Sequence, residues 1–184
     1  AILLKGKPLF LPEGREVLIS NEAGLHRHPI RWEPMPDRIA NGIDPGGGLE
    51  IGPPRTIPLP AVPTRFARSH DGRTLGMVSE SSGMGWLLDL DSETVGQERL
   101  IHNGASFVGL SPDGQWMSTS GWHSGLVRLW NARTGAIVRE WPLFRATSFF
   151  TLDSRVLVTS QGDEFGFHDV ESGKLLYRLR RDVS

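Results

Sequence analysis

The chain has 184 residues, 38% of them hydrophobic, and this is enough apolar material for one substantial domain with a buried core. Its 20 lysines and arginines nearly balance 21 aspartates and glutamates, which argues against a partner drawn in by a long-range field, such as nucleic acid or an anionic membrane surface. The absence of cysteine excludes disulfides, thiolate catalysis and cysteine-ligated zinc, and it leaves the redox compartment open.

The first unit, residues 1–32, carries a weak strand-turn-strand pattern. Pro12-Glu13-Gly14 is a turn signal between two apolar runs. Further on, His26 and His28 stand two residues apart and would share one face of a strand, a spacing that suits a metal ion. Because no third ligand is evident, we expect an exposed polar strand face and no metal site. This unit is interpreted as an imperfect first sheet.

Proline and glycine then interrupt the pattern. Residues 33–63 hold eight of the 13 prolines and a Pro45-Gly46-Gly47-Gly48 run, with few apolar residues suited to strands. Proline lacks the N–H that a sheet ladder needs, so this segment cannot form a central strand. We expect residues 33–63 to be a long insertion or a linker between sheets. A loop of this length is uncommon in a compact domain and is often functional.

The remainder of the chain is repetitive. Ser69-His70-Asp71-Gly72 and Ser111-Pro112-Asp113-Gly114 lie 42 residues apart, and Asp153 follows Asp113 by a further 40. Downstream in the copy, Trp130-Asn131 is followed 38 residues later by His168-Asp169. A repeat of this length is the size of a propeller blade. The predicted units are residues 64–101, 102–142 and 143–184.

Each copy contains four short predicted strands divided by turns. In the clearest copy they are Phe107–Leu110, Trp116–Thr119, Leu126–Trp130 and Ala136–Trp141. Asp, Ser and Gly between them favour turns, and the runs themselves carry β-branched and aromatic residues. A single four-stranded sheet leaves both faces uncovered, so such blades stack around an axis. The sequence therefore predicts an all-β fold, a β-propeller of about four four-stranded antiparallel blades with an irregular first blade.

The unit from His102 to Pro142 resembles a WD repeat. Leu110-Ser111-Pro112-Asp113-Gly114 matches the strand-turn signature of that family, and Leu126–Asn131 matches its Trp-Asp strand, with Asn131 in place of Asp. The other copies match this signature less closely and resemble the divergent WD repeats of bacterial multidomain proteins. Because rings of this family commonly have about seven blades, the resemblance implies that these blades are part of a larger ring.

The same resemblance assigns structural positions. Family blades are often locked by a hydrogen-bonded set of Ser or Thr, His, Asp and Trp, and this unit offers Thr119, His102 and Trp130. The Asp would fall near His123 and Ser124, where the sequence has no acid, so we do not expect a complete set. The predicted structural repeat positions are Asp71, Gly72, His102, Asp113, Gly114, Thr119, Trp130, Asn131, Asp153, His168 and Asp169.

Candidate binding residues are few. Trp122 and His123 fall in the turn between the second and third strands of their blade, where an indole would be partly exposed, and exposed aromatic residues are favoured as interface anchors. The sequence has no Gly-x-Ser-x-Gly elbow, no phosphate-binding glycine loop and no acid-base cluster at the strand starts. We therefore expect no catalytic residue, no cofactor and no metal.

The predicted function is a non-catalytic protein-interaction scaffold that uses the rim loops of a propeller. Loops on a stiff scaffold bind a partner with little ordering cost in the protein. The partners would be other proteins or other domains of the same polypeptide, not nucleic acid. Two alternatives stay open: a sensor or docking domain of a larger signalling protein, such as a bacterial kinase, and a propeller enzyme with a site in its central channel.

Membrane insertion is not predicted. No apolar run reaches the roughly 18–20 residues that a spanning helix needs, and Ala1–Pro12 has no basic segment leading into a signal-peptide core. We expect a soluble segment. The sequence does not identify its compartment, although the cytoplasm is favoured.

Overall fold

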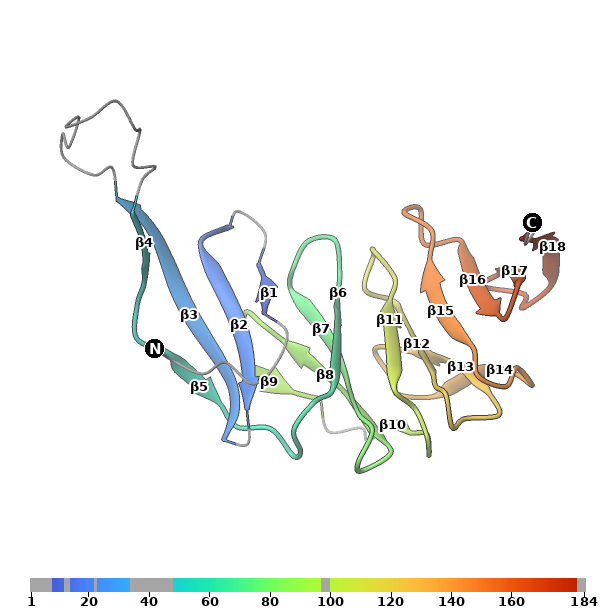
Figure 1. The fold of residues 1–184 in the computed structure, drawn as a ribbon, viewed down its shortest axis with the longest axis horizontal. Helices are drawn as coiled ribbons and strands as arrows, with labels where there is room; N and C mark the ends of the chain where they lie inside the picture. Colours follow the sequence, from blue (N-terminus) through green and yellow to red (C-terminus); the bar gives the residue numbers. More distant parts are fainter. Residues whose placement is uncertain (1–7, 12–13, 22, 34–47, 97–99, 182–184) are drawn as a thin grey trace. The chain divides into compact units, whose positions relative to one another are not determined.

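The computed structural model describes residues 8–11, 14–21, 23–33, 48–96 and 100–181. Their regular structure consists of short strands in four antiparallel sheets, so the fold is all-β, a partial β-propeller of about four blades (Figure 1). The chain divides into two compact units, residues 1–62 and 63–184. In the described part of the chain, no helix is long and apolar enough to cross a membrane.

The first unit contains one sheet, which we call the first blade. Its strands are β1 (Leu9–Phe10), β2 (Glu16–Asn21), β3 (Gly24–Glu33), β4 (Gly48–Ile51) and β5 (Arg55–Ile57). The first three pair in sequence order, and both β4 and β5 pair with β3. β4 lies along the end of β3 and β5 along its start, so the two share the fourth strand position.

The outer edge of this sheet lies inside the segment that was expected to be an insertion or a linker, residues 33–63. Pro53 and Pro54 interrupt the edge between β4 and β5. An edge strand needs ladder donors on one side only, so proline is tolerated there although it is excluded from the sheet centre. The first blade therefore extends to Ile57, beyond the boundary at residue 32 that the sequence suggested. Residues 34–47 of that segment lie outside the described residues.

The second unit contains three sheets. The second blade comprises β6 (Arg65–Arg68), β7 (Thr74–Ser79), β8 (Met84–Asp89), β9 (Thr94–Val95) and β10 (Leu100–Ile101), and β9 and β10 both pair with β8. The third blade comprises β11 (Phe107–Leu110), β12 (Trp116–Ser120), β13 (Val127–Asn131) and β14 (Ile137–Trp141). The fourth blade comprises β15 (Thr147–Phe150), β16 (Val156–Gln161), β17 (Glu164–Asp169) and β18 (Leu175–Arg180). In the third blade, the predicted strand ends differ from these bounds by one residue at most.

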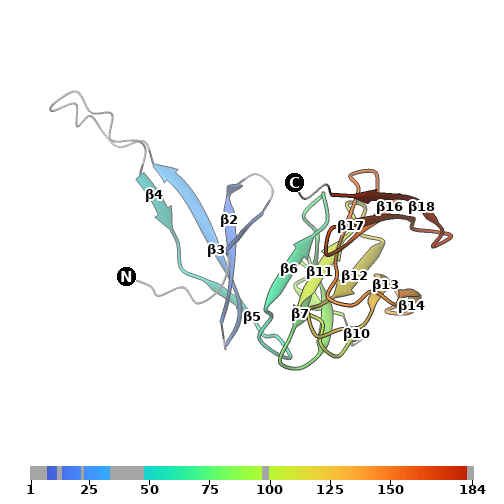
Figure 2. The same cartoon turned by 45° about the vertical axis from the view of Figure 1, so that its right-hand side comes forward.

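These three blades stack face to face. β11, the first strand of the third blade, lies against both β6 and β15, and its place beside β6 is also visible in Figure 2. The apolar cluster between the second and third blades contains Leu100, Leu110, Met117 and Trp130. The cluster between the third and fourth blades contains Val127, Leu129, Ala146, Leu157 and Val170. Full burial of a Val or Leu side chain stabilises a fold by about 1.5–3 kcal/mol, so these clusters are the main force that holds blade to blade.

The turns between the first and second strands repeat the same chemistry in all three blades. A hydroxyl donates to Oδ1 of the aspartate two residues later at 2.6 Å, in the pairs Ser69–Asp71, Ser111–Asp113 and Thr151–Asp153. The hydroxyl bond is the largest cause that lowers the pKa of Asp71 and of Asp153 below the usual range. Gly72 and Gly114 follow with φ angles of 73° and 72°, which glycine adopts without steric cost.

Successive turns are also joined across the blades. The backbone N of His70 donates to the carbonyl O of Pro112 at 2.8 Å, and the backbone N of Asp113 donates to Oγ of Ser154 at 3.1 Å. Ser154 stands where the other turns have glycine, with φ of 64°. Its hydroxyl makes a bond that glycine could not make, and this offsets part of a left-handed backbone cost of about 1–2 kcal/mol.

The turns between the third and fourth strands use an Oδ1 acceptor in each blade. Asn131 accepts from the backbone N of Arg133 at 3.0 Å and of Thr134 at 2.9 Å. Asp89 accepts in the same way from the backbone, and Asp169 accepts from Ser172. An amide oxygen replaces a carboxylate oxygen here because only an acceptor is required.

Candidate binding site on the loop rim

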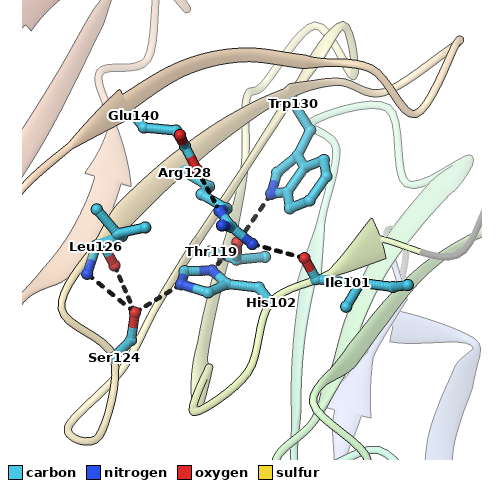
Figure 3. Close-up of polar contacts among 8 residues, drawn as sticks. All are labelled: Ile101, His102, Thr119, Ser124, Leu126, Arg128, Trp130 and Glu140. Atoms are coloured by element: carbon cyan, nitrogen blue, oxygen red, sulfur yellow. Dashed lines mark hydrogen bonds and ion pairs between the residues drawn. The ribbon is translucent and has the colours of Figure 1, made fainter.

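A buried hydrogen-bond network runs through the third blade beneath its rim loops (Figure 3). Nε1 of Trp130 donates to Oγ1 of Thr119 at 2.8 Å, and this oxygen lies 2.7 Å from Nδ1 of His102. Nε2 of His102 lies 2.6 Å from Oγ of Ser124. All four side chains belong to residues that are at most 3% exposed. The structure thus brings together His102, Thr119 and Trp130, and Ser124 takes the fourth position.

The hydrogen-bond pattern determines which nitrogen of His102 carries the hydrogen. Oγ of Ser124 donates its single hydrogen to the carbonyl O of Leu126 at 2.9 Å and accepts from the backbone N of Leu126 at 3.1 Å. Nε2 of His102 must therefore donate to Ser124, which leaves Nδ1 to accept from the hydroxyl of Thr119. A neutral imidazole in this tautomer satisfies every polar atom in the network.

The electrostatic surroundings favour the same neutral form. Burial, the larger cause, and the nearby positive charge of Arg128 together lower the pKa of His102 to about 4, while Glu140 acts in the opposite direction. An imidazolium would carry a hydrogen on each ring nitrogen, and the Thr119 hydroxyl would then lose its acceptor. His102 is thus uncharged at neutral pH and acts as a structural link.

Arg128 closes the outer side of the network. Its Nε donates to Oε1 of Glu140 at 2.6 Å, and its Nη1 donates to the carbonyl O of Ile101 at 2.7 Å (Figure 3). The guanidinium carbon also lies 5.9 Å from the centre of the Trp130 ring, within range of a cation–π contact. These contacts attach the residue before His102 to two strands of the third blade.

Two rim loops of this blade, residues 102–106 and 121–125, pack backbone to backbone. At Gly104, which has φ of 78°, an added Cβ would lie 2.7 Å from the carbonyl O of His123. At Gly121, an added Cβ would overlap the carbonyl O of Gly104. The backbone N of Trp122 also donates to Oγ of Ser106 at 3.3 Å. The two loops therefore fix each other, and with them the position of Trp122.

Trp122 ends a row of stacked side chains that we call the rim cluster, made of Arg65, Phe107 and Trp122. The Trp122 side chain is 54% exposed, and its ring packs edge-on against Phe107 with the centroids 5.9 Å apart. The guanidinium carbon of Arg65 lies 5.7 Å from the centre of the Phe107 ring. Arg65 begins β6 and Phe107 begins β11, so the cluster spans two blades. His123, the other candidate binding residue, is exposed beside Trp122.

The equivalent interior positions differ in the neighbouring blades. In the fourth blade, His168 replaces the tryptophan, and its Nε2 lies 3.1 Å from Oγ1 of Thr159. Nδ1 of His168 has no hydrogen-bond partner in the described part of the chain, and burial lowers its pKa. In the second blade the same two positions hold Met77 and Leu88, which are both fully buried. Of these three blades, the third is the one with a complete polar network.

The two histidines of β3 form no metal site in the described residues. Nδ1 of His26 lies 2.9 Å from Oγ1 of Thr56, and Nδ1 of His28 lies 3.1 Å from the carbonyl O of Gly52. No group of three His, Asp or Glu residues is placed to hold an ion in the described ranges. The expected exposed face is wrong for His28, which is only 6% exposed and whose ring lies within hydrogen-bond distance of the backbone between β4 and β5.

Comparison with known proteins defines the class of fold. No protein-family model and no curated protein matches the sequence. Among solved structures, the chain is similar to hydrazine synthase of Kuenenia stuttgartiensis, with a TM-score of 0.62 and 15% identity over 94% of this chain. The match covers 48% of the length of that chain, about half of it. A likeness at this identity shows a shared propeller-type fold and carries no activity with it.

Proposed function

We propose that this chain is a non-catalytic protein-interaction scaffold of the WD-repeat type, which binds other proteins, or other domains of its own polypeptide, through its rim loops. The observation that carries the proposal is Trp122, a large apolar side chain that is 54% exposed on a loop held from below by buried contacts. Aromatic residues of this kind are enriched among the residues that dominate binding energy. A fixed loop also loses little conformational freedom when a partner binds.

The WD-repeat assignment is supported by the interior of the third blade. The links from Trp130 to Thr119, from Thr119 to His102 and from His102 to the loop before β13 join three of the residue types in the hydrogen-bonded set that the resemblance implies. The turns at Asp71, Asp113 and Asp153 add the repeated hydroxyl–aspartate bond.

The state of the buried histidines supports a role without catalysis. His102 and His168 are both less than 10% exposed, and their pKa values are lowered by burial. A general base needs reach to a substrate proton, which these imidazoles do not have because their ring nitrogens face other parts of the blade interior.

The test is a quantitative pull-down from a cell extract with the full chain as bait. Proteins captured by the wild type are compared with those captured by a Trp122→Ala/His123→Ala double variant. Loss of a defined set of proteins in the double variant is the expected result. The matched control is Leu152→Ala, which removes a side chain that is 89% exposed in a turn on the opposite rim.

Two results would contradict the proposal. One is capture of the same proteins by the wild type and the double variant. The other is equal loss of capture in Leu152→Ala, because this would assign binding to general apolar exposure and not to the Trp122 loop. Thermal unfolding of each variant, which we expect to change little at these exposed positions, confirms that the comparison is between folded proteins.

A further inference from the structure

A second cation–aromatic pair lies next to the Trp122 loop on the same rim. The guanidinium carbon of Arg145 lies 5.4 Å from the centre of the Phe144 ring, and the Phe144 side chain is 53% exposed. The backbone N of Arg145 approaches the carbonyl O of Ser124 at 3.4 Å, and Nε2 of Gln161 donates to the carbonyl O of Phe144 at 2.9 Å. The Phe144–Arg145 pair is thereby tied to the loop that carries Trp122 and to the fourth blade.

The rim therefore presents two arginines, Arg65 and Arg145, and the contacts that join them run through the Trp122 loop. Arg65 reaches Trp122 through the Phe107 ring, and Arg145 is joined to the Trp122 loop at Ser124. The side chains of Arg65, Trp122 and Arg145 are all exposed. The loop that follows β12 lies at the same end of the third blade as the start of β11, because β11 and β12 are antiparallel. β11 in turn lies against β6 and β15, the first strands of the neighbouring blades.

Neither arginine has a carboxylate partner in the described residues. The ion pairs of the second unit instead join Arg73 to Asp91, Arg128 to Glu140 and Arg178 to Glu164. Glu80 and Asp163 also lie in rim loops, yet no oxygen of either is within 4.0 Å of the Arg65 or Arg145 nitrogens. The two guanidinium groups are thus held over phenyl rings with their N–H donors available to a ligand.

Two guanidinium groups held over phenyl rings on either side of an exposed indole suit one kind of partner. A guanidinium on a ring keeps its charge, and its planar N–H donors match the two oxygens of a carboxylate. The exposed indole between the arginines offers an apolar contact. On the basis of the proposed function, we infer that the rim binds an extended acidic peptide segment, in which Asp or Glu side chains on both sides of an apolar residue pair with Arg65 and Arg145 while that residue packs on Trp122.

The experiment is a selection from a random peptide library displayed on phage, with the full chain as target and the Trp122→Ala variant as counter-target. Enriched peptides are expected to carry Asp or Glu on both sides of an apolar residue. Their affinities are then measured by fluorescence anisotropy. Arg65→Gln and Arg145→Gln are each expected to weaken binding about fivefold, as an exposed interfacial charge pair does, and added salt is expected to weaken it too. The matched control is Arg133→Gln, which removes an exposed arginine from the opposite rim and is expected to leave affinity unchanged.

The possible failures are distinguishable. The inference is overturned if the enriched peptides lack acidic residues. It is also overturned if acidic peptides bind Arg65→Gln, Arg145→Gln and the wild type with the same affinity. In either case the proposed function stands if Trp122→Ala still abolishes binding. Tighter binding of a single-stranded oligouridine than of any enriched peptide would overturn both, because the rim would then be a nucleic-acid surface. An absence of any enrichment overturns the inference, and the pull-down then decides the proposed function.

Discussion

Nε2 of His102 and Oγ of Ser124 lie 2.6 Å apart at the base of the rim loops, and both groups are uncharged. In the family that the blade resembles, an aspartate is expected near His123 and Ser124. A carboxylate there would favour an imidazolium. The Ser124 hydroxyl instead accepts a hydrogen bond from Nε2 and donates one to the carbonyl O of Leu126. The network of this blade therefore works with a neutral histidine, and its response to pH follows from that.

The first prediction concerns stability at acidic pH. The pKa of His102 is about 4 in the folded chain and about 6.5 when unfolded, so the unfolded state binds the proton more tightly. The contribution of His102 to the free energy of unfolding is complete above pH 6.5, and it is lost as the pH falls from 6.5 through 4. The loss is on the order of 3 kcal/mol, since each tenfold difference in proton affinity corresponds to about 1.4 kcal/mol. Urea unfolding at a series of pH values measures it.

His102→Gln is the control for this pH dependence. His168 also has a lowered pKa and contributes in the same direction, so the relevant quantity is the difference in slope between the wild type and the variant. If the variant does not fold, the imidazole resonances of His102 in the wild type provide the readout, and they should remain those of a neutral ring at pH 5. A His102 that titrates near pH 6.5 in the folded chain would contradict the assignment.

The second prediction is that Ser124→Asp weakens or reverses this effect. A carboxylate within hydrogen-bond distance of Nε2 stabilises the imidazolium, so the pKa of His102 should rise and the loss of stability at acidic pH should shrink or reverse. Ser124→Asn is the matched control, because it has nearly the same shape and adds no charge. Equal pH dependence in the two variants would show that residue 124 does not set the charge state of His102.

The sequence made the blade pattern predictable because its signals are local. Asp113 and Gly114 determine a turn by their own side chain and backbone, and the strands on either side of it were expected within one residue. Ser124 was not expected in the buried network, because a serine that replaces an acid can be recognised only when the hydrogen-bond directions around His102 are known.

The rim cluster was missed for a different reason. Arg65 and Phe107 are 42 residues apart, which is the repeat period, so they occupy the same position in consecutive blades. This spacing indicates that the two residues occupy equivalent positions. It does not predict their contact, because strand patterns do not specify how blades stack. The edge strands β4 and β5 were hidden by Pro53 and Pro54, since the sequence shows that proline is unfit for a sheet centre but not that an edge strand is present.

The third prediction tests the hydroxyl at the centre of the network. Thr119→Val keeps the shape of the side chain but leaves Nε1 of Trp130 without an acceptor and Nδ1 of His102 without a donor. Each unsatisfied buried group costs about 1–3 kcal/mol, so we expect a loss of about 2–4 kcal/mol in the free energy of unfolding. Thr134→Val, at an exposed position in a turn of the same blade, should change stability by less than about 0.5 kcal/mol. A similar small change for Thr119→Val would mean that the hydroxyl bonds contribute little.

The fourth prediction links the packing of the two rim loops to binding. In Gly104→Ala, the new Cβ would lie 2.7 Å from the carbonyl O of His123, and alanine would also have to adopt φ of 78°. The strain should cost about 1–3 kcal/mol, and the chain can reduce it by moving the loop that carries Trp122 and His123. We therefore expect a lower free energy of unfolding together with weaker capture of the proteins that depend on Trp122.

Gly125→Ala provides the comparison that separates these effects. Gly125 lies in the same loop, but an added Cβ there would meet no atom within 4 Å, so stability and capture should both stay close to those of the wild type. If Gly104→Ala lost stability and yet captured the same proteins at the same level, the fixed position of the Trp122 loop would be irrelevant to binding. Binding would then depend on the chemical identity of the exposed side chains alone, and the ordering of the rim by the His102 network would serve only the stability of the blade.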